Sequence, residues 1–79
     1  MGVLDFPSRR FAAASRPAVD DAYMAWFSAH ARCSEALKAW NTAAPGDRAI
    51  AYRVYRARLE REEMAAAHLQ RVQDLRSAA

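Results

Sequence analysis

Apolar positions between residues 18 and 41 recur at alternating steps of four and three, the spacing that places side chains on one face of an α-helix. The stripe consists of Val19, Tyr23, Trp26, His30, Cys33, Leu37 and Trp40. Pro17 precedes it at a position that helices tolerate, and Asp20 and Asp21 follow in the expected first turn, where carboxylates favour the helix dipole. An unbroken heptad pattern predicts a helix that packs along a second helix.

A second helix is predicted over residues 47–77, because this stretch lacks proline and glycine and is rich in Ala, Arg, Glu, Leu and Gln. Its expected apolar stripe is Ile50, Val54, Ala57, Met64, His68, Val72 and Leu75, broadened by Ala51, Ala65 and Leu69. Pro45 and Gly46 predict the turn, with Asn41 ending the first helix in the left-handed conformation and Asp47 capping the next. So short a turn predicts an antiparallel pair.

Pairing the two helices about this turn predicts which side chains meet. The expected pairs are Trp40 with Ile50, Leu37 with Val54, Cys33 with Ala57, His30 with Arg61, Trp26 with Met64, and Tyr23 with His68. His30 and Arg61 form the one polar layer, expected to be buried and to fix register or oligomeric state. A second row at intervals of seven, made of Ala22, Ala29 and Ala36, would let a neighbouring helix approach closely.

The first 17 residues are predicted to form a flexible N-terminal arm, followed by the hairpin domain over residues 18–79. This segment contains two prolines and one glycine and has no sustained period. Its large apolar residues are Val3, Leu4, Phe6 and Phe11. Three interpretations stay open: the arm folds back over the hairpin, docks on another protein, or stays disordered.

The amount of apolar surface predicts self-association. A chain of 79 residues is of the size at which a single core rarely supplies more than about 3–5 kcal/mol, so a partner is expected. Phe27 on the first helix and a strip of Tyr52, Tyr55 and Leu59 on the second exceed what one helix contact uses. These residues, with the apolar residues of the arm, are the interface candidates. We expect a dimer that forms a four-helix bundle, and the alternative is a larger protein partner covering the same faces.

Charge leaves a second functional class open. The formal net charge of +3 is spread along the chain without a block of like charge, which weakens the case for nucleic-acid binding. Arg48, Arg53 and Arg56 nevertheless alternate with Tyr52 and Tyr55, as on some nucleic-acid surfaces. A nucleic-acid-associated regulatory protein is therefore the alternative to a protein–protein interaction module.

The residues with reactive side chains do not form a catalytic or metal-binding motif. His30 and Cys33 are three apart, and Glu62 could approach His30, yet zinc usually takes four ligands. We expect no metal and no cofactor, and Cys33, the one cysteine, to be a buried free thiol. No nucleophile has a base beside it and no glycine-rich phosphate loop occurs, so no enzymatic activity is expected.

The expected function is therefore that of a small accessory subunit, adaptor or inhibitor that acts through its helix faces. No long apolar run marks a signal peptide or a membrane span. The expected location is the cytoplasm.

Overall fold

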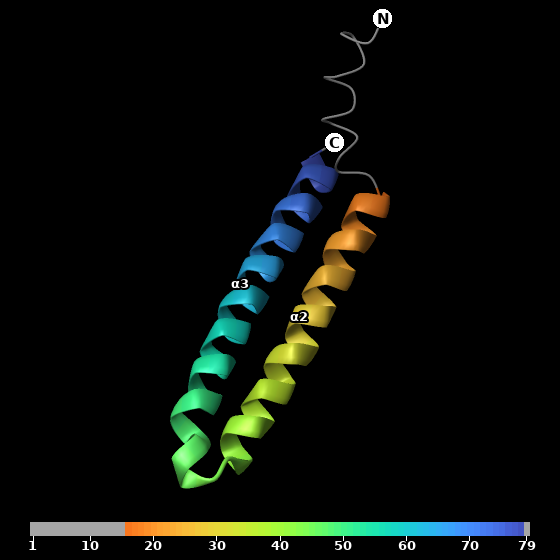
Figure 1. Ribbon diagram of the computed structural model, residues 1–79. Coiled ribbons are helices and arrows are strands. Elements are labelled where there is room, and N and C mark those ends of the chain that lie inside the picture. Colours follow the sequence, from red (N-terminus) through yellow and green to blue (C-terminus); the bar gives the residue numbers. More distant parts are fainter. Residues whose placement is uncertain (1–15, 79) are drawn as a thin grey trace, which may run out of the picture.

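The computed structural model describes residues 16–78, which form an antiparallel two-helix hairpin (Figure 1). Helix α2 spans Arg16–Thr42, helix α3 spans Arg48–Ala78, and the 3₁₀ turn η1 spans Pro45–Asp47. The two helices lie side by side along their length, with the turn at one end. The predicted all-α hairpin is confirmed, whereas the predicted contacts of residues 1–15 lie outside the described residues, including those of Val3, Leu4, Phe6 and Phe11.

The ends of the helices differ from the predicted ones. Because α2 begins at Arg16, its first turn contains no acidic residue, and the placement predicted for Asp20 and Asp21 is wrong. Among the described residues none has a positive φ, so Asn41 does not end α2 in the left-handed conformation. Instead the helix continues to Thr42, whose hydroxyl donates a hydrogen bond to the carbonyl oxygen of Lys38 at 2.9 Å.

The connection between the helices is made by extended backbone followed by a tight turn. Ala44 is extended, with φ −64° and ψ 154°, as expected for a residue that precedes a proline. Pro45 then starts η1, and the backbone N–H of Asp47 donates to the carbonyl oxygen of Ala44 at 2.8 Å. Asp47 immediately precedes α3. This turn reverses the chain within a few residues, which places the two helices in contact.

The helices meet mainly through small side chains. Ala22, Cys33, Ala36 and Val72 are the buried hydrophobic residues of the described chain, at 4–8% exposure. On α2 the buried and half-buried residues continue as Trp26, Ala29 and Trp40; on α3 they include Ala51, Tyr55, Leu59, Glu62, Ala65 and Leu69. We call these two rows, with the four buried residues, the contact stripe. The row on α2 alternates steps of four and three, the heptad spacing, and the row on α3 advances by steps of three or four.

The contact stripe of α2 is rotated from the predicted one toward the alanine row. Tyr23 is 47% exposed and Leu37 37% exposed, so these two predicted contact residues border the contact rather than fill it. The separation of two packed helices depends on the side chains between them, and alanines allow a close approach. Burying Ala22 and Ala36 thus brings the backbones together and leaves larger side chains outside.

The predicted contact stripe of α3 is confirmed at Val72 and at the residues predicted to broaden it, Ala51, Ala65 and Leu69, and is wrong at its other positions. Ile50, Val54, Met64 and Leu75 are 46–71% exposed, whereas the actual stripe begins one residue later, at Ala51. As a result Trp40 packs against Tyr52 and Tyr55 instead of Ile50. Both helices are rotated, relative to the prediction, so that small residues face each other. These small residues permit the close contact.

The hairpin has no core of large side chains. No side chain among the described residues is fully buried, and nine large hydrophobic residues are exposed. Each helix can cover only one side of the other. A hairpin whose helices are apolar on more than one side therefore leaves large apolar side chains exposed. Within residues 16–78, no helix is both long enough and apolar enough to cross a membrane.

Candidate interaction surfaces

A polar cluster joins the middle of the two helices. Nδ1 of His30 donates a hydrogen bond to Oε2 of Glu62 at 2.8 Å, and this is the only ion pair of the described chain. The side chain of His30 is 50% exposed and that of Glu62 21%. The predicted approach of Glu62 to His30 is confirmed. The predicted buried layer of His30 and Arg61 is wrong, because both side chains are exposed and the partner of His30 is one residue further along.

Cys33 lies in the contact stripe, one turn along α2 from His30. Burial raises the pKa of the Cys33 thiol above its ordinary value of 9.0, and its hydrogen bond to Glu62 and the charges of Glu62 and Glu63 raise it further. The thiol is free and buried, as predicted. A protonated, buried thiol is a poor nucleophile and a poor metal ligand. Within residues 16–78, no three His, Cys, Asp or Glu residues are arranged to hold a metal ion.

Aromatic rings pack together near the turn. The ring centroid of Trp40 lies 4.9 Å from that of Tyr52 and 5.5 Å from that of Tyr55, the latter pair stacked at 20°. The guanidinium of Arg48 lies 5.9 Å from the Trp40 ring, within the range of a cation–π contact. These contacts tie the end of α2 to the first two turns of α3.

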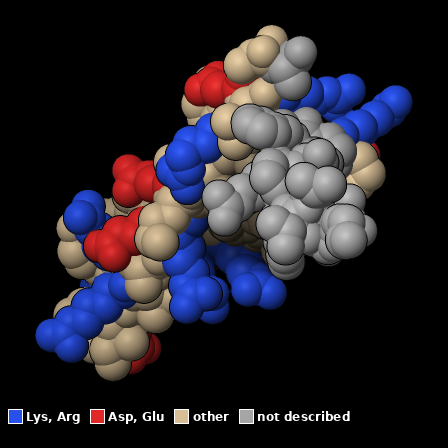
Figure 2. All heavy atoms as spheres, turned by 90° about the horizontal axis from the view of Figure 1, so that it is seen from above, with Lys and Arg blue, Asp and Glu red and all other residues tan. Residues whose placement is uncertain are grey.

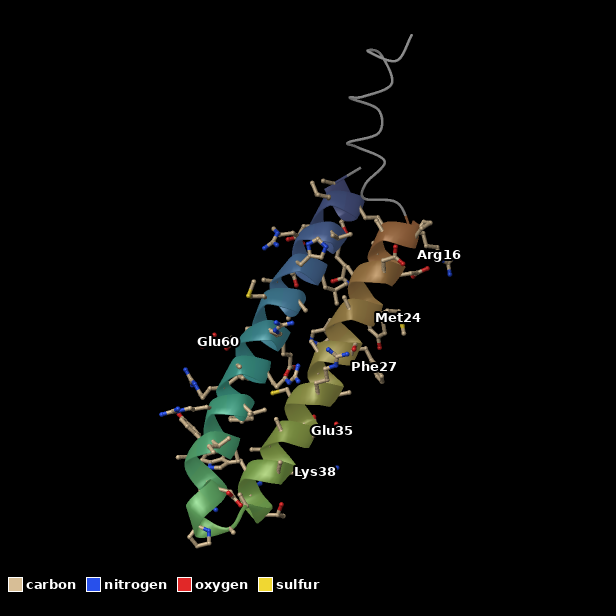
Figure 3. The ribbon with its side chains drawn as sticks, in the orientation of Figure 1. Arg16, Met24, Phe27, Glu35, Lys38 and Glu60 are labelled. Carbon is tan, nitrogen blue, oxygen red and sulfur yellow. The ribbon has the colours of Figure 1, made fainter. Side chains whose placement is uncertain are left out.

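A second set of rings continues along α2. The centroid of Tyr23 lies 5.7 Å from that of Trp26 and 6.4 Å from that of Phe27. Trp26 in turn stacks on the His30 imidazole at 5.3 Å. Phe27 projects from α2 on the side away from α3 (Figure 3). The row therefore leads from the polar cluster to an exposed aromatic edge.

We call the side of the hairpin that carries these rings the aromatic face. It consists of Tyr23, Phe27, His30, Leu37, Trp40, Tyr52, Tyr55 and Leu59. Four of its large side chains are 37–51% exposed, those of Tyr23, Phe27, Leu37 and Tyr52. The interface candidates Phe27, Tyr52, Tyr55 and Leu59 all lie on this face. Tyr55 and Leu59 also belong to the contact stripe, whereas Phe27 and Tyr52 lie beside it.

A groove lined by arginines lies on the side of the contact stripe opposite to the aromatic face. Two residues along a helix turn about 200°, so Arg32 lies on the opposite side from His30. Arg32, Arg58 and Arg61 line a hollow of about 530 Å³ together with Ala25, Ala29 and Met64. We call this surface the arginine groove. It was not predicted, because Arg61 was assigned to the contact between the two helices.

A second hollow of about 660 Å³ adjoins the first and shares Arg32 and Arg58 with it. Glu35 and Val54 also line it. Because two arginines line both hollows, the groove is elongated along the hairpin.

The basic residues singled out in the sequence do not form one surface. Arg48 packs near Trp40, whereas Arg53 and Arg56 are exposed and line neither hollow. Seen along the hairpin, lysine and arginine side chains occupy several sides and alternate with acidic ones (Figure 2). In the described chain no arginine lies within 4.0 Å of a carboxylate. Arg56 and Arg58 therefore form no ion pair with Glu60 and Glu62, although each glutamate follows its arginine by four residues along the helix.

Comparison with protein-family models, with curated proteins and with solved structures finds no match to this chain. The functional argument therefore rests on the exposed surfaces of the hairpin.

Proposed function

We propose that this chain is a non-enzymatic protein–protein interaction module, and that its first partner is a second copy of itself. The observation that carries this proposal is the exposure of large apolar side chains on a hairpin without a core. Exposed apolar patches larger than a few hundred Å² usually mark an interaction surface. The aromatic face is the best candidate because both helices contribute to it.

The energetics favour covering this face. Full burial of a side chain such as Leu or Phe contributes about 1.5–3 kcal/mol. Tyr23, Phe27, Leu37 and Tyr52 remain 37–51% exposed in the single hairpin, so each retains part of that free energy for an interface. For a chain this small, a few such side chains decide whether the folded state is stable.

A second copy is the occupant that the chemistry of the face supports. Two hairpins crossing at about 20° form an ordinary four-helix bundle, and a two-fold axis makes each aromatic face its own complement. His30 and Glu62, near the middle of this face, already pair within one chain. Each of these two side chains therefore keeps a hydrogen-bond partner when two copies meet. The bundle would present its remaining surfaces to a larger partner, as an accessory subunit, adaptor or inhibitor does.

Matched substitutions on α3 test this proposal. Leu59→Glu places a charge on the aromatic face and should shift the purified protein from dimer to monomer in size-exclusion chromatography with light scattering. Ile50→Glu is the control, because Ile50 is 65% exposed and lies outside the aromatic face. Equal elution of both variants with the wild type would contradict the proposed interface. A wild-type chain that dimerises only with a co-purifying protein would favour the larger partner.

Nucleic-acid binding is the alternative, and the arrangement of the basic residues supports it less. Stacking surfaces for bases need aromatic rings next to cationic groups along one groove. Here the rings lie on the aromatic face, whereas Arg32, Arg58 and Arg61 lie across the contact stripe from it. Retention on heparin that falls steeply with salt would support the alternative, because phosphate contacts release counterions.

A further inference from the structure

We propose that the arginine groove binds the phosphate group of a phosphate monoester, independently of assembly through the aromatic face. Three guanidiniums, Arg32 from α2 with Arg58 and Arg61 from α3, line one hollow whose walls contain no carboxylate. Guanidiniums stay charged at all physiological pH values. The hollow therefore gathers three positive charges. Glu35 lines the adjoining hollow, yet none of the three guanidiniums forms an ion pair within the described chain.

The positions of the arginines suit an anion that reaches several donors at once. Arg58 is half-buried, so its guanidinium is screened by water less than that of the exposed Arg32 or Arg61. Like charges in one hollow repel one another, and a bound anion removes that repulsion. Each guanidinium offers a planar fork of N–H donors that matches phosphate geometry.

Phosphate fits this donor set better than a carboxylate. A phosphate monoester carries about −1.5 to −2 charge at neutral pH and presents three terminal oxygens, whereas a carboxylate has one charge and two oxygens. Three guanidiniums from two helices can therefore each find an acceptor oxygen on one phosphate. In the rest of the wall, Ala25, Ala29 and Met64 offer apolar contact to the organic part of an ester, and Ser28 adds a hydroxyl. The hollow's volume of about 530 Å³ lies within the range of small-molecule sites.

The proposed site stays open in the proposed dimer. The groove lies across the contact stripe from the aromatic face, so covering one surface leaves the other free. Binding and assembly can therefore be measured separately, and the loss of one does not imply the loss of the other.

The test is an NMR titration of the full chain at constant ionic strength, with phenyl phosphate, inorganic phosphate and benzoate as the probes. Phenyl phosphate should cause saturable shifts of the Nε–H signals of Arg32, Arg58 and Arg61. It should bind at least about tenfold more tightly than benzoate, the factor that one additional charge-assisted hydrogen bond supplies. It should also bind more tightly than inorganic phosphate, because only the ester contacts the apolar walls.

Variants with equal charge separate the groove from the general field of a basic protein. Arg58→Gln with Arg61→Gln should weaken phenyl phosphate binding at least about tenfold, whereas Arg53→Gln with Arg56→Gln should leave it nearly unchanged. Arg32→Gln, an exposed change on the other helix, should weaken binding as well and provides a test if the double variant folds poorly. Equal weakening by the control pair, equal affinity for benzoate, affinity for inorganic phosphate matching that for the ester, or shifts confined to other residues would each overturn the proposal.

Discussion

Nδ1 of His30 lies 2.8 Å from Oε2 of Glu62, although the two residues are 32 positions apart in the sequence. The contact joins the middle of α2 to the middle of α3 and forms the only ion pair of the described chain. Cys33 lies one turn along α2 from His30, and the same Glu62 side chain helps to raise the pKa of its thiol. The contact between His30 and Glu62 favours one axial register of the hairpin.

The strength of this pair is expected to be small. Both side chains are partly exposed, and exposed ion pairs contribute about 0.2–1 kcal/mol. A double-mutant cycle of His30→Ala and Glu62→Ala, measured by urea unfolding at pH 6, should give a coupling free energy in that range. Any effect of Glu62 on the Cys33 thiol is absent from both Glu62 variants and cancels in the cycle. A coupling above about 2 kcal/mol would contradict a solvent-screened pair.

The buried thiol of Cys33 predicts a loss of stability at alkaline pH. Because the folded state raises the pKa of Cys33 above 9.0, the thiol of the unfolded chain ionises first as pH rises. The contribution of the neutral thiol is fully present below about pH 9 and is lost progressively above it. The difference in unfolding free energy between the wild type and Cys33→Ala should therefore fall as the pH rises above about 9.

Tyrosine and lysine groups that titrate over the same range occur in both proteins, so they cancel in this difference. A difference that stays flat across the range would show that the thiol is not desolvated. Slow reaction of Cys33 with a thiol reagent at neutral pH, rising to the free-thiol rate in denaturant, is the matching chemical measurement.

The close helix contact predicts that the buried alanines cannot be enlarged without cost. Ala36 is 7% exposed and faces α3, so Ala36→Leu should separate the helices and lower the unfolding free energy by about 1–3 kcal/mol. Ala31→Leu is the matched control, because Ala31 is exposed, and it should change stability by less than about 0.5 kcal/mol. Both are compared with the wild type at one protein concentration. Similar costs at both positions would contradict the assigned contact stripe.

Local sequence signals were sufficient for the architecture. The absence of proline and glycine after Asp47 predicted α3, and Pro45 and Gly46 predicted the turn and hence the antiparallel arrangement. Proline and glycine act on their own backbone, so their effect can be read from neighbouring residues alone. Helix ends were predicted to within two residues of those observed, at Arg16 and Ala78 at the outer ends of the hairpin.

The rotation of each helix could not be predicted in the same way. Ala22, Ala29 and Ala36 repeat at sevens just as the large residues beside them do, so periodicity alone supports either row. The choice depends on how closely the second helix approaches, and that distance is a property of the pair. The large residues were assigned to the contact because they bury more area, yet Tyr23 and Leu37 lie at its edge.

The same rotation explains which surface residues were found in advance. The sequence identified the interface candidates Phe27, Tyr52, Tyr55 and Leu59. Each is a large apolar residue that a single contact between two helices was not expected to bury. The arginine groove was missed because Arg61 was placed in the predicted contact, in a buried polar layer with His30. Turning α3 by about 100°, one residue, moves Arg61 to the groove and brings Glu62 to His30.

Self-association is the central claim of this account, and sedimentation equilibrium of the purified full chain at tens of micromolar tests it most directly. The account predicts a mass of twice the 8.8 kDa of one chain, with the helical circular-dichroism spectrum retained. Dilution should lower both the mass and the thermal midpoint, since assembly and folding are linked. A well-folded monomer at the same concentration, or a poorly ordered chain that folds only with a co-purifying protein, would contradict the homodimer.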